Sequence, residues 1–218
     1  MIAYTILVEK EKWGKQEEEL LSFVSPERQE KIRSLRFDSG KLTALYGALL
    51  VRMSLSKLVQ TDPREFVIAK EAHGKPYVQG RKDCYFNLSH TKGCILCGVS
   101  NTSELGVDVE LLDKKAPYGV MKRVFHEQEI AYVESSEKKK EEAFFEVWTS
   151  KEAYTKQLGC GLTISLTECN TREEQIQRKL QSWSEDGYLY CVCSEETVER
   201  KNIIMDELLA FYEDLGKV

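Results

Sequence analysis

Three carboxylates in the second half of the chain have the residue types and spacing of a site for a divalent cation. Asp108 and Glu110 stand two apart in a run of β-branched and apolar residues, and residues i and i+2 of a strand point to the same face. Glu152 lies in a segment where Trp148, Glu152 and Lys156 recur every four residues, which is helical spacing. The pattern predicts that one strand and one helix bring these three acids together.

Oxygen ligands of this kind suit Mg²⁺, which keeps several waters and takes its remaining ligands from substrate phosphates. Such a site predicts phosphoryl transfer, in which catalysis consists mostly of positioning a polyphosphate and neutralising its developing charge. Lys156, one turn beyond Glu152, is placed for the second task. The alternative is that Asp108 and Glu110 are solvent-facing acids on an edge strand, and that Glu152 and Lys156 form an ordinary surface ion pair. The joint occurrence of these residues favours the site.

Composition restricts the class of protein. The 218 residues are 42% apolar and 31% charged, which is typical of a globular protein with one domain or two small ones. There is no uncharged apolar window of about 18 residues, so we expect no membrane span. The N-terminal residues lack the basic lead and small-residue cleavage site of a secretory signal. The formal charge of −5 argues against a nucleic-acid partner, which would require a basic surface.

Seven cysteines are present, an odd number in a chain of this length without a secretory signal. This predicts reduced thiols and a cytoplasmic location. Cys94 and Cys97 form the only C-x-x-C pair, and Cys191 and Cys193 lie in another apolar run. Since a structural zinc site needs four ligands with recognisable spacing, we interpret these cysteines as small buried hydrophobes in strands.

The elements that would position the carboxylates follow from periodicity, caps and turn residues. The predicted strands span the first residues of the chain, 66–69, 85–90, 93–100, the segment around Asp108, 162–166 and 188–193. The predicted helices span a segment that begins at Pro26, then 42–59, 120–133, 141–158 and 208–215. A helix followed by a hairpin occurs in both halves of the chain. This order predicts an α+β fold with two similar lobes, 1–103 and 104–218, that share a ligand-binding cleft.

Lys151 is unexpected where it stands, because it falls within the apolar stripe of the 141–158 helix. A long basic side chain at such a position can extend its ammonium group to the surface. The sequence favours this interpretation over a catalytic role.

Four ordered motifs resemble those of the 4′-phosphopantetheinyl transferases. Residues 105–110 and the pattern Trp148-x-x-Lys151-Glu152-Ala-x-x-Lys156 are similar to the signature of the family. Residues 73–76 (His-Gly-Lys-Pro) and 86–90 (Phe-Asn-Leu-Ser-His) match two upstream motifs of its larger, surfactin-synthetase-activating type. Because the four motifs occur in order with compatible gaps, chance agreement is improbable, and the resemblance covers most of the chain.

The resemblance implies two pseudo-symmetry-related α+β lobes, with coenzyme A and Mg²⁺ in the cleft between them. The implied reaction moves the 4′-phosphopantetheine arm of coenzyme A onto a serine hydroxyl of an apo carrier protein and releases adenosine 3′,5′-bisphosphate. The carrier can be an acyl, peptidyl or polyketide carrier protein, and the sequence does not distinguish them. Two fused lobes complete a cleft within one chain, so we expect a monomer.

The resemblance also assigns roles residue by residue. Asp108, Glu110 and Glu152 would hold the metal, Glu152 would accept the serine proton as general base, and Lys156 would offset charge on the transferring phosphate. The residues expected to bind the substrate are Arg28, Lys31, Lys75, Pro76, Ser89 and His90. For Arg28 and Lys31, contact with the 3′-phosphate and a solvated helix face remain equally open. Taken alone, the other four substrate-binding residues would be ordinary turn residues.

Two other functions remain open at this point. A coenzyme A-binding protein without transferase activity would not need the carboxylate trio. A Mg²⁺-dependent hydrolase of nucleotide pyrophosphates would use the same cation with water as the nucleophile. Dependence on an acceptor protein separates the hydrolase from the transferase.

Overall fold

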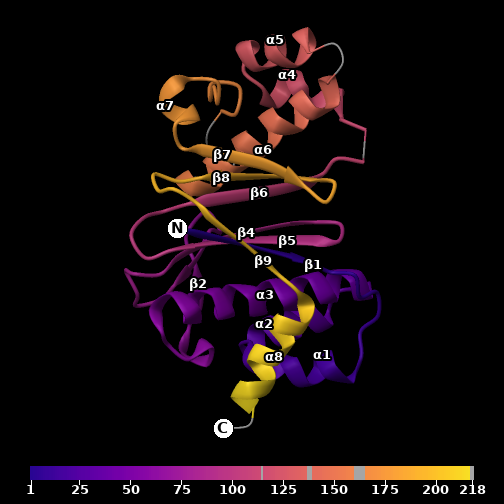
Figure 1. Cartoon of the computed structure of the whole chain (residues 1–218), viewed down its shortest axis with the longest axis vertical. Coiled ribbons are helices and arrows are strands. Elements are labelled where there is room, and N and C mark those ends of the chain that lie inside the picture. The colour runs from indigo at the N-terminus through magenta and orange to yellow at the C-terminus, as the bar shows by residue number, and fades with distance from the viewer. Residues whose placement is uncertain (114, 137–138, 160–164, 217–218) are drawn as a thin grey trace.

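The computed structural model describes residues 1–113, 115–136, 139–159 and 165–216, and its elements stack in four layers (Figure 1). Helices lie at both ends of the long axis, and two β-sheets lie between them. Each sheet can therefore bury one face against helices and the other against the second sheet. The expectation of an α+β fold with two lobes is confirmed.

The strands are β1 (Ile2–Leu7), β2 (Ile68–Lys70), β3 (Pro76–Val78), β4 (Tyr85–Thr91), β5 (Cys94–Ser100), β6 (Gly106–Leu111), β7 (Leu180–Glu185), β8 (Tyr188–Cys193) and β9 (Glu199–Ile203). The α-helices are α1 (Lys15–Leu20), α2 (Pro26–Arg33), α3 (Asp38–Val59), α4 (Met121–Val124), α5 (Glu127–Ser135), α6 (Lys140–Leu158), α7 (Glu174–Gln177) and α8 (Met205–Gly216).

The first lobe is built on the sheet β4-β5-β1-β9. Helix α3 covers one face of this sheet with residues at helical spacing, of which Leu42, Leu45 and Leu49 are fully buried. By length and composition alone α3 would pass as a membrane span, yet 61% of its most apolar window is buried inside the protein. The burial of this core helix accounts for its apolar composition.

The second lobe is built on the sheet β6-β8-β7, and α6 packs on one face of it. Successive strand residues face opposite sides, so the two faces of β6 have different neighbours. Val107 and Val109 join the apolar layer between the two sheets, together with Leu96 from β5 and Val192 from β8. The alternate residues of β6, including Asp108, therefore lie on the face toward α6.

The end of the described chain returns to the first lobe. Strand β9 pairs parallel with β1, and α8 packs on α3, where the Tyr212 hydroxyl donates to the Leu49 carbonyl at 2.7 Å. The division into 1–103 and 104–218 remains a proposal. Strand β9 and helix α8 come after residue 103 in sequence, yet they pack against β1 and α3 of the first lobe. Strand β9 was not predicted because its run Glu-Arg-Lys-Asn-Ile has no apolar alternation.

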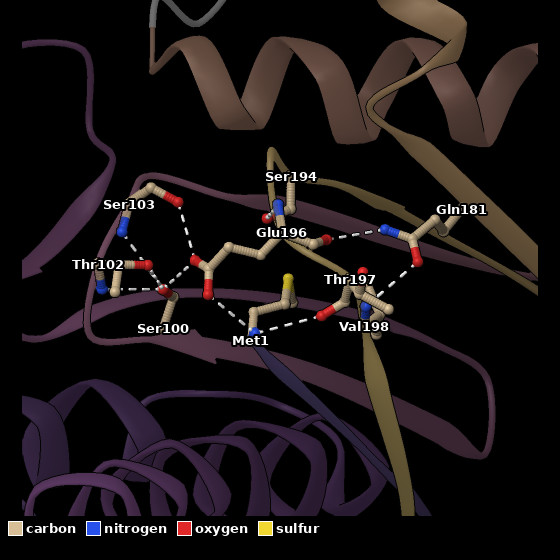
Figure 2. Close-up of polar contacts among 9 residues, drawn as sticks. All are labelled: Met1, Ser100, Thr102, Ser103, Gln181, Ser194, Glu196, Thr197 and Val198. Carbon is tan, nitrogen blue, oxygen red and sulfur yellow. Dashed lines mark hydrogen bonds and ion pairs between the residues drawn. The ribbon is translucent and has the colours of Figure 1, made fainter.

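Glu196 anchors the connection between β8 and β9 where it crosses from one lobe to the other (Figure 2). Its carboxylate accepts hydrogen bonds from Ser100 at the end of β5, from Ser103 at 2.9 Å and from the Met1 amino group at 3.0 Å. Gln181 on β7 adds a bond to the Glu196 carbonyl at 2.9 Å. The crossing is therefore tied to both sheets through side chains.

Several sequence-based predictions of elements differ from the structure. The helix predicted over 120–133 is divided into α4 and α5, because His126 caps α5 and the Glu129 carboxylate accepts the His126 N–H at 2.7 Å. Helix α3 begins at Asp38, four residues earlier than predicted. Of the strand predicted over 162–166, residues 162–164 lie outside the described residues, and 165–166 belong to no strand. The short elements α1, β3, α7 and β7 were not predicted.

Candidate active site

Strand β6 presents Asp108 at the boundary between the lobes. The residue is 5% exposed, and its Oδ1 accepts hydrogen bonds from the Ser89 hydroxyl and the Lys156 ammonium, both at 2.7 Å. Ser89 belongs to β4 of the first lobe, so both lobes position this carboxylate. The second oxygen, Oδ2, is buried without a hydrogen-bond partner among the described residues. An orphaned carboxylate oxygen of this kind is a free ligand for a cation.

Helix α6 brings Glu152 and Lys156 to the same place and ends at Gly159, whose positive φ of 68° forms a left-handed C-cap. Lys156 forms its ion pair with Asp108 across the helix–strand contact, and its ammonium also lies 3.2 Å from the Val107 carbonyl oxygen. The alternative of an ordinary surface pair between Glu152 and Lys156 therefore does not describe this lysine.

Two adjoining cavities open between the lobes. A cavity of about 360 Å³ is lined by Leu88, Ser89, His90, Asp108, Glu110, Trp148, Glu152 and Lys156. A second cavity, also of about 360 Å³, is lined by His73, Gly74, Lys75, Pro76, Asn87, Leu88, Glu152, Thr155, Lys156, Gly159 and Leu166. The two cavities share Leu88, Glu152 and Lys156, so they form one inter-lobe cleft. All three predicted carboxylates line this cleft.

The carboxylates in this cleft are electrostatically strained. Burial raises the pKa of Asp108, and the nearby Glu110 adds to this, against the lowering effect of Lys156 and Ser89. Burial likewise raises the pKa of Glu152, which Lys156 lowers and the charges of Asp108 and Glu110 raise further. Acids that resist ionisation together would be stabilised by a cation.

The donor set fits Mg²⁺, because it consists of carboxylate oxygens and includes the orphaned Asp108 Oδ2. In the part of the chain that the structure describes, however, no three His, Cys, Asp or Glu side chains are gathered into a ready-made ligand cluster. Asp108, Glu110 and Glu152 line one cavity without forming a closed set of ligands. Mg²⁺ commonly completes its sphere with water and substrate oxygens, so a partial protein set is compatible with it.

Ser89 and His90 were both expected to contact the substrate, but adjacent strand residues point to opposite faces. Ser89 is 7% exposed and donates to Asp108, so its hydroxyl holds the carboxylate in place. His90 is exposed at the edge of the first cavity. Partial desolvation, followed by the charges of Lys156 and Arg28, lowers the pKa of His90 against the opposing effect of Asp108. A bound anion would reverse this balance and favour the protonated imidazole.

The two basic residues of α2 differ in their surroundings. Arg28 is half-buried and donates to the Ala44 carbonyl of α3 at 3.0 Å, and burial lowers its pKa. Its charge reaches His90. Lys31 is exposed, and it does not line either cavity in the described chain. The structure therefore brings Arg28 near the cleft and leaves Lys31 on the solvated side of the helix.

Lys75 and Pro76 line the second cavity from the first lobe, as does the turn that precedes them. The Lys75 ammonium is engaged across the lobe boundary, since it pairs with Glu104 and donates to the Gln157 carbonyl at 2.9 Å. Its alkyl chain thus lines the cleft, while its charge ties the β2–β3 hairpin to the end of α6.

The prediction that Lys151 extends to the surface was wrong. Its side chain is 4% exposed and pairs at 2.7 Å with Glu129, which is fully buried. The other oxygen of Glu129 accepts the Thr171 N–H at 2.8 Å and the Thr171 hydroxyl at 2.6 Å, and Lys151 also donates to the Cys169 carbonyl. These hydrogen bonds satisfy the buried ion pair between Lys151 and Glu129. The pair therefore links α5, α6 and residues 169–171.

Asn87 is a residue that sequence reasoning did not assign. It is 5% exposed on β4, and its side-chain oxygen accepts the Val107 N–H of β6 at 2.9 Å. β4 and β6 are edge strands of different sheets, so this side chain replaces a ladder hydrogen bond between them. The available signal was an asparagine inside a strand, which is unfavourable unless the side chain has a specific partner.

Comparison with known proteins gives a consistent result along the chain. The model of the 4'-phosphopantetheinyl transferase superfamily matches residues 104–209, and the model of the 4'-phosphopantetheinyl transferase N-terminal region matches residues 11–101. The chain is 28% identical over 176 residues to 4'-phosphopantetheinyl transferase Sfp of Bacillus subtilis (strain 168), covering 80% of this chain and 78% of that protein. It is 29% identical over 173 residues to the ffp transferase of Bacillus subtilis, covering 79% and 76%. It is 30% identical over 159 residues to the psf-1 transferase of Bacillus pumilus, covering 72% and 67%.

Proposed function

Since the chain belongs to the 4'-phosphopantetheinyl transferase superfamily and has the transferase activity of its relatives, we propose that the inter-lobe cleft is where this enzyme acts on coenzyme A. The substrates are coenzyme A and an apo carrier protein, whose serine hydroxyl receives the 4′-phosphopantetheine arm. The observation that supports this assignment of the site is the cleft itself, where Asp108 and Glu110 of β6 and Glu152 and Lys156 of α6 line one cavity. Ser89 and His90 of the first lobe line the same cavity.

In this proposal the serine oxygen attacks the phosphorus that bears the pantetheine arm, and the bond from that phosphorus to adenosine 3′,5′-bisphosphate breaks. Glu152 accepts the serine proton, and its raised pKa makes it a stronger base than an ordinary exposed carboxylate. Lys156 lies beside Asp108 in the same cavity, from which its ammonium can donate to the transferring phosphate.

Asp108, Glu110 and Glu152 would hold Mg²⁺, which when bound would neutralise charge on the pyrophosphate. The other predicted roles concern the nucleotide. His90, with Arg28 behind it, would donate to a phosphate, and Lys75 and Pro76 would flank the nucleotide. Ser89 would act through Asp108. Lys31 has no observation in its favour beyond its position on α2.

Family membership favours transfer over simple binding and over hydrolysis. The experiment is to incubate the purified chain with coenzyme A and MgCl₂, with and without apo acyl, peptidyl and polyketide carrier proteins, and to record intact masses. We expect one carrier to gain the mass of the arm, with adenosine 3′,5′-bisphosphate formed only when that carrier is present. Loss of coenzyme A without an acceptor would indicate a hydrolase, and no mass gain on any carrier would contradict the proposal.

We retain two further expectations as part of the proposal. Cys84, Cys94, Cys97, Cys191 and Cys193 are buried thiols, which fits a reducing compartment such as the cytoplasm. The cleft is formed within one chain, which supports a monomer. Gel filtration with light scattering tests the latter.

A further inference from the structure

Gly106 faces the backbone of α6 at the closest approach between β6 and that helix. A Cβ atom at this position would lie well inside 3.0 Å of both the Ala153 carbonyl oxygen and the Gln157 nitrogen, a separation that real Cβ atoms essentially never show. Both atoms belong to the helix backbone, so neither can rotate away as a side chain would. Glycine is therefore the residue that lets the strand and the helix approach so closely.

The contrast with Gly98 shows why this contact is unusual. A Cβ at Gly98 would meet only side-chain atoms, the nearest from Leu105 and Val107, with Val107 Cγ1 at 2.8 Å. Side chains can change rotamer to make room. At Gly106 the added methyl group could be accommodated only if α6 as a whole moved away from β6.

A movement of α6 at this point would act directly on the proposed site. The Gln157 nitrogen belongs to the peptide group that links Lys156 to Gln157, and Ala153 is the residue that directly follows Glu152. A shift of the helix backbone here would therefore also move Glu152 and Lys156. On the strand, Gly106 lies on the same face as Asp108, two residues away. The 2.7 Å contact between Lys156 and Asp108 is made at the present spacing of the two elements.

We infer that Gly106 is a positioning residue, whose missing side chain sets the distance at which α6 brings Glu152 and Lys156 to the acids of β6. This inference rests on the proposed function, because it assumes that the acids and Glu152 act together on one cation. A larger residue at position 106 would leave all four side chains unchanged. It would increase the distance between Glu152 and Lys156 on α6 and the two acids on β6.

The test compares Gly106→Ala with Val192→Ala in the full chain. Val192 is fully buried on β8, on the face turned away from α6, so its truncation costs stability without moving the helix. The readouts are thermal unfolding, the MgCl₂ concentration that half-saturates transfer, and Mn²⁺ binding in the presence of coenzyme A by electron paramagnetic resonance. We expect Gly106→Ala to weaken cation binding by about tenfold or more, with no change for Val192→Ala at a comparable loss of stability.

Ala153→Val provides a second variant in case Gly106→Ala does not fold. Ala153 is fully buried against Cys191 and Cys193, so a larger side chain there also pushes α6 away from the sheet. Unchanged Mn²⁺ binding in a folded variant would overturn the inference. Failure of both variants to fold would also overturn it, because the contact between β6 and α6 would then be needed for folding as a whole. Absence of Mn²⁺ binding by the wild-type protein would overturn it too. Transfer by the wild-type protein tests the proposed function separately.

Discussion

At the scale of single residues, the site holds carboxylates whose ionisation is unfavourable. Asp108 is buried and Glu152 is half-buried, and burial raises the pKa of each. The charge of Glu110 raises the pKa of Asp108 further, and the charges of Asp108 and Glu110 raise that of Glu152. A folded-state pKa above the unfolded value means that ionisation of these acids at neutral pH opposes folding. Lys156 compensates only in part. The arrangement makes sense if a cation and a polyphosphate complete the site during the reaction.

Glu152→Gln should separate activity from stability. Loss of the proposed general base should lower transfer by at least about 100-fold. Removing one of the mutually repelling carboxylates should raise the melting temperature of the metal-free protein, by about 2–4 °C for each ~1 kcal/mol relieved. Carrier-protein mass analysis and differential scanning calorimetry measure the two effects. Glu141→Gln, an exposed acid on the same helix, is the control and should change neither. A variant with full activity would remove Glu152 from the mechanism.

At the scale of elements, polar side chains hold together segments that share no backbone ladder. Glu129 and Lys151 join α5 to α6, and Asn87 joins β4 to β6. Glu196 anchors the crossing from β8 to β9. Each of these groups is buried or half-buried with its partners in place, so each specifies one arrangement of the elements that contact it.

Glu196→Gln should destabilise the protein in a pH-dependent way. Burial raises the pKa of Glu196, but hydrogen bonds, the largest from Ser100 and then Thr102, outweigh it and lower the pKa to about 2. Because the folded pKa lies below the unfolded value, the carboxylate contributes stability above about pH 4.5, and that contribution is lost as the pH falls toward 2. We expect a loss of about 2 kcal/mol at pH 7 by urea denaturation, shrinking progressively below pH 4.5.

The neighbouring variant Glu195→Gln is the matched control for this prediction. Glu195 pairs at 2.6 Å with Lys179 and is 60% exposed, so its loss should change the free energy of unfolding only slightly. A difference between Glu196→Gln and the wild-type protein that stays constant down to pH 2 would show that the carboxylate charge is not the source of the effect.

At the scale of the whole molecule, the first lobe is not one continuous segment. Its sheet needs β9 beside β1, and its core helix α3 needs α8. The second lobe is inserted between these parts of the chain. The site depends on this arrangement, because β4 of the first lobe and β6 of the second must lie edge to edge for Ser89 to reach Asp108.

Residues 1–103 alone should therefore fail to fold. Without β9 and α8 one edge of the sheet and part of α3 would be exposed, which favours unfolding or aggregation. Ser103 donates to Glu196 at 2.9 Å, so a short Gly-Ser linker can join residue 103 directly to residues 196–216. That shortened chain should unfold cooperatively by circular dichroism and show dispersed amide signals by NMR. Cooperative folding of 1–103 by itself would contradict the role given to the C-terminal return.

Much of the local structure was readable from the sequence. The i and i+2 spacing of Asp108 and Glu110, the four-residue spacing on α6 and the stop at Gly159 are set by neighbours along the chain, and the structure has them. The family motifs identified the fold and the activity. Short polar elements such as β9 escaped prediction, because an edge strand without a buried face has no apolar alternation.

The partners of the buried polar groups were decided only by the tertiary structure. Lys151 was expected at the surface, and only the packing of α5 places Glu129 beside it. Ser89 was expected at the substrate, and only the approach of the two sheets turns its hydroxyl to Asp108. Periodicity encodes which face of an element is buried, since that depends on nearby residues. Which distant group meets that face depends on the free energy of packing the whole chain, which local spacing does not contain.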